Sequence, residues 1–327
     1  MVDFLARPTF DTILLGSLYT MMALGLTLTY KVTKIPNFAH AEYVTIGAYA
    51  TVAMVNRLGF TGVGGILAIA VSFLASAGVA LGVDELVFKP LFRRGASPLH
   101  MLVASIGAGL MLRYLVFIGA DLADLLSVKA NLSAQTVWVL GNGSVSSLHL
   151  TIVPTVAGIV IVLHLLFVGT RVGKGMRAMA SNFDLARVSG INTTFIRRLT
   201  WLLAGGLAGV AGGFWAIHNP ITPELGWRSL LWIFAASILA GLTSFYGTIA
   251  GGYIVAAAEN FGIFFLNRAF DVDVAYKPLV VLAIIVAVFL IRPTGFAGLT
   301  VRDVLSGLRS IPSRVLERAR KLRASRG

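Results

Sequence analysis

Three polar side chains that could carry chemistry follow a proline in an otherwise apolar stretch. Asn37, His40 and Glu42 come directly after Pro36. Proline lacks an amide hydrogen and disfavours helix at the residue before it, so we expect a helix break here. Polar groups beside a broken helix at membrane depth are typical of a solute path. An ordinary helix start, with Asn37 as its N-cap, fits the same residues equally well.

Two further pairs of polar residues occur in apolar surroundings. Asp84 and Glu85 precede Lys89 and more basic residues, which predicts a solvated cluster of ion pairs at the end of a span. Glu259 and Asn260 have only apolar and small residues around them. Because burying such groups in a membrane is costly, Glu259 should face a polar cavity or pair with another span.

The remaining polar residues give no sign of a metal, cofactor or nucleotide site. The chain has no cysteine, and its five histidines lack metal-ligand spacing. The stretch from Gly169 to Gly175 looks like a phosphate-binding loop, but the spacing is one residue short and Gly175 replaces the hydroxyl. We therefore predict a chain that is not an enzyme, uses no cofactor and has no ATP site of its own.

Composition places these residues in a membrane protein. The 327 residues are 57% hydrophobic and only 13% charged, which excludes an ordinary soluble domain and a disordered chain. The net charge of +13 is concentrated between spans and in the last 30 residues. Basic clusters beside apolar spans mark the cytoplasmic face, so we expect contact with anionic lipid and none with nucleic acid.

Apolar stretches of about 20 residues predict an all-α polytopic membrane protein with about 8–9 transmembrane helices, some of them broken or re-entrant. Placing the basic loops inside puts the N-terminus outside and the C-terminus in the cytoplasm. The expected spans are 10–30, 62–83, 99–120, 150–170, 199–218, 229–247 and 276–291, with weaker ones at 37–55 and 250–266.

Small residues recur at a spacing of four in several of these spans. Such stripes let helix backbones approach closely in lipid, so small-residue-rich packing is expected. The stripes include Gly205, Gly209 and Gly213, the pair Gly78 and Gly82, and the pair Gly247 and Gly251.

An ordered series of motifs over residues 10–299 resembles the permeases of branched-chain amino-acid ABC transporters. It departs from the usual pattern at Ala41, Ser189 and Thr243, where the family commonly has glycine, leucine and glycine. The motifs are Gly25–Tyr30, Ile35–Glu42, Ile46–Tyr49, Lys89–Leu91, Ser105–Gly107, Gly175–Asn192, Ala240–Gly252, Tyr276-Lys277 and Arg292–Gly295.

The resemblance implies a multi-pass subunit of the prokaryotic plasma (inner) membrane that translocates branched-chain or other hydrophobic amino acids. It also implies three kinds of partner: a second permease, identical or homologous; two cytoplasmic ATPases; and an external solute-binding protein. A urea or short-amide permease of the same superfamily is one alternative, and an ion-coupled secondary transporter is another. A secondary transporter should keep carboxylates on an ion path, and only Glu42 and Glu259 qualify.

Two candidate sites follow, within a permease domain over residues 1–299. The cytoplasmic segment 171–198 resembles the helix that couples such permeases to their ATPases, with an apolar stripe at helical spacing beside two arginines. The basic residues 300–327 predict an amphipathic cytoplasmic tail on anionic lipid. The coupling residues are Met176, Arg177, Met179, Phe183 and Arg187, and those of the translocation path are Asn37, His40, Glu42, Gly241, Ser244 and Glu259.

Overall fold

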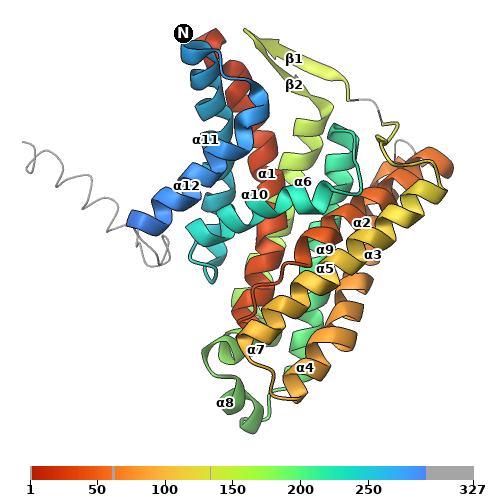
Figure 1. Ribbon diagram of the computed structural model, residues 1–327, viewed down its shortest axis with the longest axis vertical. Helices are drawn as coiled ribbons and strands as arrows, with labels where there is room; N and C mark the ends of the chain where they lie inside the picture. The colour runs from red at the N-terminus through yellow and green to blue at the C-terminus, as the bar shows by residue number, and fades with distance from the viewer. Residues whose placement is uncertain (1, 61–62, 133, 292–327) are drawn as a thin grey trace, which may run out of the picture.

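The structure is a computed structural model that describes residues 2–60, 63–132 and 134–291. The described chain is a bundle of helices of different length and tilt (Figure 1). The 300–327 tail lies outside the described residues. The α-helices are α1 (Val2–Thr33), α2 (His40–Val52), α3 (Val63–Val83), α4 (Lys89–Arg93), α5 (Pro98–Leu122), α6 (Ser147–Gly169), α7 (Arg171–Ser181), α8 (Phe183–Val188), α9 (Thr193–His218), α10 (Leu225–Leu239), α11 (Phe245–Phe270) and α12 (Lys277–Ile291).

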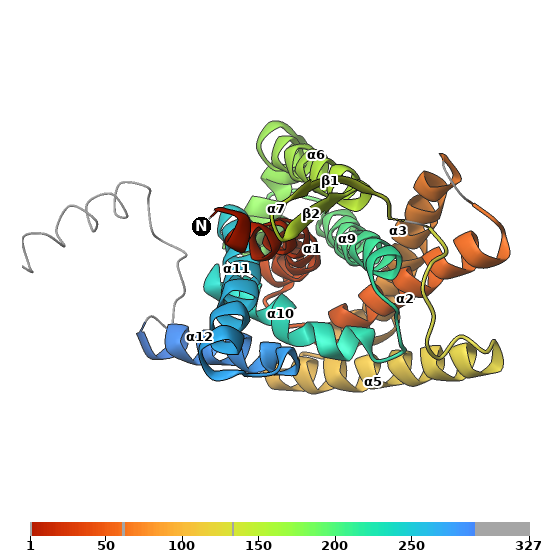
Figure 2. The same ribbon diagram turned by 90° about the horizontal axis from the view of Figure 1, so that it is seen from above.

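Helices α1 and α9 form the centre of the bundle, and the other helices surround them (Figure 2). Close approach requires glycine here: a Cβ atom on Gly47 of α2 would lie 2.3 Å from the Cα of Gly209 in α9. The expected packing of the α9 stripe is therefore confirmed. Gly78 and Gly82 make no such contact within this chain, because an added Cβ at either would meet nothing within 4 Å.

Six described helices are long and apolar enough to cross a membrane, and α10 and the 274–288 region form shorter apolar helices. The all-α polytopic prediction is confirmed, but the expected span 229–247 is wrong. Helix α10 ends at Leu239, and a turn separates it from the long α11. The weaker prediction at 250–266 lies inside this long helix. A hydropathy window misses the turn because its residues are themselves mostly apolar.

The helix break at Pro36 is confirmed. Helix α1 ends at Thr33, Lys34 adopts a left-handed φ of 58°, and α2 begins only at His40. Two other helices continue through wider π turns: η1 (Ala53–Arg57) follows α2, and η2 (Asp84–Phe88) joins α3 to α4. A short 3-10 helix, η3 (Val274–Tyr276), precedes α12.

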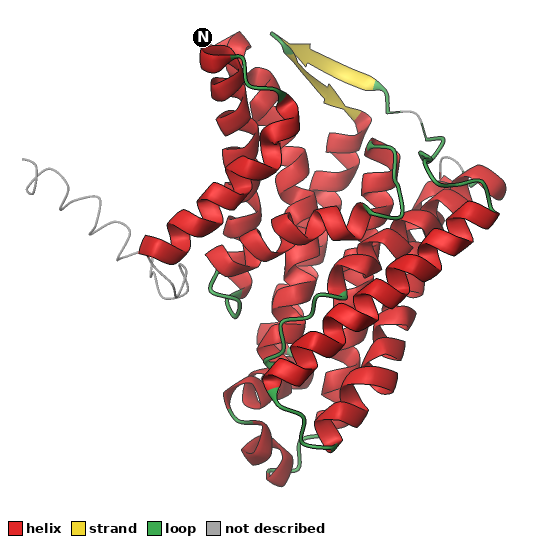
Figure 3. Ribbon diagram, in the orientation of Figure 1, coloured by secondary structure: helices red, strands yellow, loops and turns green. Residues whose placement is uncertain are grey.

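One small antiparallel hairpin was not predicted. Strands β1 (Thr136–Leu140) and β2 (Gly143–Ser146) lie at the end of the molecule opposite α7 and α8 (Figure 3). The hairpin packs on the first turns of α1, where the Arg7 amide donates to the Asn142 side chain at 3.2 Å. The stretch between the expected spans 99–120 and 150–170 thus contains ordered structure.

Candidate functional site

His40 is buried in the helix core. Its Nε2 atom lies 2.9 Å from the Met22 carbonyl oxygen of α1, and its ring packs edge-on against Tyr43. Gly25 leaves room for the ring, since an added Cβ would lie 2.5 Å from His40 Cε1. Through these contacts, His40 of α2 packs against α1 and holds the two helices together.

Asn37 is also buried, but it shapes the chain before α2. Its Oδ1 atom accepts a hydrogen bond from the Ala39 amide at 3.0 Å, which is an Asx turn. The N-cap of α2 is Ala39, without a side-chain cap, so Asn37 is not the N-cap. The neighbouring Phe38 amide donates to Ser105 of α5 at 3.2 Å, which fixes the linker against that helix.

Glu42 lies at the junction of α2, α5 and α10. Its carboxylate accepts a hydrogen bond from Thr45 at 3.3 Å, and the Thr45 hydroxyl accepts one from the Gly226 amide in α10 at 2.8 Å. Arg113 of α5 interacts electrostatically with this carboxylate and forms an ion pair with Glu224 at 3.3 Å. This junction therefore holds acidic and basic groups close together, as binding of a zwitterion requires.

Gly241 and Ser244 form the turn between α10 and α11. Gly241 and Leu242 have φ values of 79° and 60°, and glycine adopts this left-handed region without strain. The Ser244 hydroxyl accepts a hydrogen bond from the Gly247 amide at 3.1 Å and so caps α11. Both residues have a clear structural role here.

Glu259 pairs with residues of other helices, which is one of the two environments that the sequence predicted for it. The Tyr19 hydroxyl of α1 donates to it at 2.8 Å, and Lys277 of α12 lies 3.9 Å away. Tyr19 also stacks on Trp232 with 5.3 Å between ring centroids, and Trp215 lies beside both rings. A buried carboxylate is thus held within an aromatic cluster.

These residues form three separate groups. Among the described residues, no hydrogen bond or ion pair joins the 37–42 segment to the Gly241–Ser244 turn or to Glu259. The sequence could not show this separation, because it depends on how α1, α5 and α10 pack. Within the residues that the structure describes, no group of three or more His, Asp or Glu side chains is placed to hold a metal ion.

The 171–198 segment contains two short helices, α7 and α8, where one was expected, and it ends in the first residues of α9. Asn182 interrupts it and caps α8 by accepting from the Leu185 amide at 2.9 Å. Met176 and Met179 are buried in a small core with Val32 and Ile196. The predicted apolar stripe is therefore turned largely toward this chain's own helices.

Other residues of the same segment provide the exposed apolar surface. Leu185 is 61% exposed, Val188 80% and Phe195 53%, and Arg187 is exposed beside them. Phe183 is half-buried and packs edge-on against Phe92 of α4. Helical periodicity alone could not separate the buried apolar residues from the exposed ones.

The predicted solvated cluster at Asp84 is wrong. Asp84 is 1% exposed and pairs with Arg197 of α9 at 3.1 Å. Glu85 pairs with Lys89 and, at 2.6 Å, with Arg198. The arginine partners lie 113 residues away in the sequence, so the acidic pair fastens the end of α3 to the start of α9.

Comparison with known proteins adds to this geometry. The family model described as the branched-chain amino acid transport system / permease component matches residues 9–289. The probable branched-chain amino acid transport permease protein LivH of Methanocaldococcus jannaschii is 34% identical, over 88% of this chain and 90% of that protein. LivH of Escherichia coli K12 is 28% identical over 89% of this chain and 95% of that protein.

A third relative covers a similar range. The high-affinity branched-chain amino acid transport system permease protein BraD of Pseudomonas aeruginosa is 28% identical over 86% of this chain and 92% of that protein. The range of the family model includes the Pro36 break, the 171–198 segment and the turn before α11, and six described helices are able to span a membrane. The chain therefore belongs to the family of branched-chain amino acid transport permease components.

Proposed function

We propose that this chain is a membrane subunit of an ABC importer that moves branched-chain amino acids across the prokaryotic plasma membrane. The observation that carries the proposal is the family match over residues 9–289, together with a relative 34% identical over 88% of the chain. The three relatives described above are branched-chain amino acid permeases by name, which favours this substrate class over urea or short amides.

Energy would come from two partner ATPases that dock at α7 and α8. Leu185, Val188 and Phe195 offer an exposed apolar surface that suits a hydrophobic groove, and Arg187 would help to position it from the side of α9. Met176 and Met179 would support this surface from beneath, and Arg177 and Phe183 would position it. A second permease and an external solute-binding protein would complete the importer, with the N-terminus outside and the basic tail inside on anionic lipid.

For the solute path we favour the Glu42 junction. A zwitterionic amino acid needs a donor for its carboxylate and an acceptor for its ammonium group, and Arg113 and Glu42 could supply them. Asn37 and His40 would hold the broken segment in place. Gly241 and Ser244 would shape the turn before α11, and Glu259 would brace α11 against α1 and α12.

Uptake of labelled leucine tests the function directly. The chain, co-expressed with its ATPases, second permease and binding protein, should restore uptake to cells that lack branched-chain amino acid import. Glu42→Gln should lower uptake at least tenfold while assembly with the ATPases persists. The matched control is Glu224→Gln, which leaves the Glu42–Thr45 contact in place and should lower uptake less. Wild-type uptake by Glu42→Gln would remove this junction from the path.

Docking needs a separate test. Val188→Asp places a charge on an 80% exposed apolar position, so it should abolish co-purification of the ATPases without unfolding the permease. Val137→Asp, on the exposed hairpin at the opposite end, should leave co-purification unchanged. Normal ATPase binding by the Val188→Asp protein would contradict the assignment of α8 as the docking helix.

A further inference from the structure

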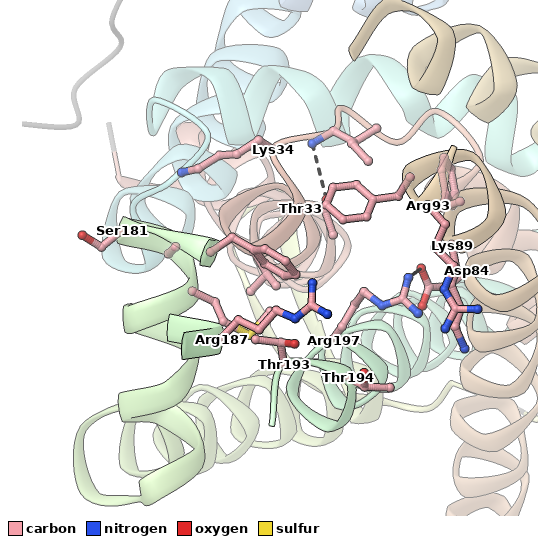
Figure 4. A pocket seen from close by; sticks show the side chains of 17 residues that line it. Thr33, Lys34, Asp84, Lys89, Arg93, Ser181, Arg187, Thr193, Thr194 and Arg197 are labelled. Atoms are coloured by element: carbon pink, nitrogen blue, oxygen red, sulfur yellow. Dashed lines mark hydrogen bonds and ion pairs between the residues drawn. The ribbon is translucent and has the colours of Figure 1, made fainter. Parts of the chain in front are cut away.

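A cavity of about 470 Å³ lies between the coupling segment and the ends of three spans (Figure 4). Thr33 ends the first span, Arg93 ends the span that begins at Gly64, and Thr193 begins the span of α9; all three residues line the cavity. The cavity therefore lies where the apolar part of the bundle stops. Lipid headgroups occupy this depth, just outside a hydrocarbon core about 30 Å thick.

The cavity carries an excess of positive charge. Of its five basic residues, Arg197 is paired with Asp84, and Lys89 is paired with Glu85. Lys34, Arg93 and Arg187 line the same cavity, and none of the three has a carboxylate partner among the described residues. Figure 4 shows Arg187 extending from α8 across the cavity toward α9.

The lining is otherwise apolar with a few hydroxyl groups. Phe88, Phe92 and Phe183 are among the apolar residues, and Thr193 and Thr194 add hydroxyls at the first turn of α9. The volume falls within the roughly 300–1,000 Å³ of small-molecule sites, which are mostly apolar with a few placed polar groups. An apolar wall beside three unpaired cations suits an anion that also carries an apolar part.

We propose that this cavity binds the phosphate group of an anionic phospholipid. Lys34, Arg93 and Arg187 would contact the phosphate, and the phenylalanine side chains would contact the glycerol and the start of the acyl chains. The lipid would bridge α8 to α1 and α4, so the coupling segment would be ordered by the membrane it lies against. The residues that line this site all precede the basic residues 300–327 in the sequence.

The basic tail of this chain is excluded as the occupant of the cavity by its charge. Residues 300–327 contain eight basic residues against Asp303 and Glu317, so this segment would be repelled by the cavity. Of the described acidic residues near the cavity, Asp84 and Glu85 already have basic partners, and the exposed Asp184 of α8 forms no ion pair with Lys34, Arg93 or Arg187. The compensating anion must therefore come from outside the chain, and the inner leaflet supplies anionic lipid at this depth.

Native mass spectrometry of the purified full-length chain in neutral detergent tests the proposal. Short-chain phosphatidylglycerol should bind at least tenfold more tightly than phosphatidylcholine with the same acyl chains. Each of Lys34→Gln, Arg93→Gln and Arg187→Gln should weaken phosphatidylglycerol binding about fivefold, or about 1 kcal/mol, and the triple variant on the order of a hundredfold. Every variant keeps the basic tail, so any lipid binding by the tail is the same in all of them.

The matched controls are Arg171→Gln and Lys174→Gln. Both remove one charge from exposed positions of α7 outside the cavity, and each should change binding by less than twofold. Equal binding of the two lipids would overturn the proposal. So would unchanged binding by a triple variant that keeps the wild-type melting temperature. Displacement of the lipid by an equal concentration of glycerol phosphate would show that the ligand is a soluble phosphate and would overturn the lipid assignment.

Discussion

Removal of Arg197 should destabilise this protein much more than removal of its neighbour Arg198. Arg197→Ala leaves the Asp84 carboxylate 1% exposed and without its closest cation, because the Arg197 guanidinium lies 3.1 Å away. Breaking a buried ion pair on one side costs about 3–5 kcal/mol. At about 2–4 °C per kcal/mol, the melting temperature should fall by about 6–20 °C.

The assay is thermal unfolding of the purified protein in detergent, followed by loss of the monodisperse peak in size-exclusion chromatography. Arg198→Ala is the matched control: its side chain is 49% exposed, so its pair with Glu85 should contribute about 1 kcal/mol or less. Asp84→Asn combined with Arg197→Met should recover most of the loss, since neither charge then remains buried and unpaired. Equal losses for the Arg197→Ala and Arg198→Ala proteins would refute this reasoning.

Three further predictions concern packing and caps. Gly47→Val should prevent folding, because a Cβ there would lie 2.3 Å from α9 backbone, whereas Gly78→Val faces open space; the yield of monodisperse protein distinguishes them. Tyr19→Phe removes a 2.8 Å donor to buried Glu259 and should cost about 1–3 kcal/mol; a melting temperature within 1 °C of wild type would contradict this. Ser244→Ala removes the cap of α11 and should cost about 1 kcal/mol, while Ser244→Asp, which can still accept from the Gly247 amide, should melt close to wild type.

The sequence predicted the features that depend on local chemistry. Apolar length revealed the membrane spans, and Pro36 revealed the break between α1 and α2, because a missing amide hydrogen acts on the nearest residues. The α9 glycines indicated close packing because a spacing of four residues places them on one face of the helix, and that face then lacks side-chain bulk. The motif order also indicated the family over nearly the whole chain.

Features that depend on distant residues were missed. The burial of Asp84 depends on its pairing with Arg197, which lies 113 positions later in the sequence. No local sequence pattern predicts that pairing. The turn after Leu239 escaped detection because Ala240 and Leu242 are as apolar as the helices they separate. Likewise, Met176 faces inward only because Val32 and Ile196 lie against it.

Backbone hydrogen bonds hold the His218 end of α9, just as ion pairs to Asp84 and Glu85 hold its Thr193 end. Val128 and Ile221 exchange backbone hydrogen bonds of 3.1 and 2.7 Å, and the Ala130 amide donates to the Ala216 carbonyl at 2.9 Å. The 26 residues from Thr193 to His218 therefore form a stiff helix about 39 Å long that is held at both ends. A tilt of about 5° imposed at the Thr193 end would move the loops at the His218 end by about 3 Å, so α9 links the two ends of this span mechanically.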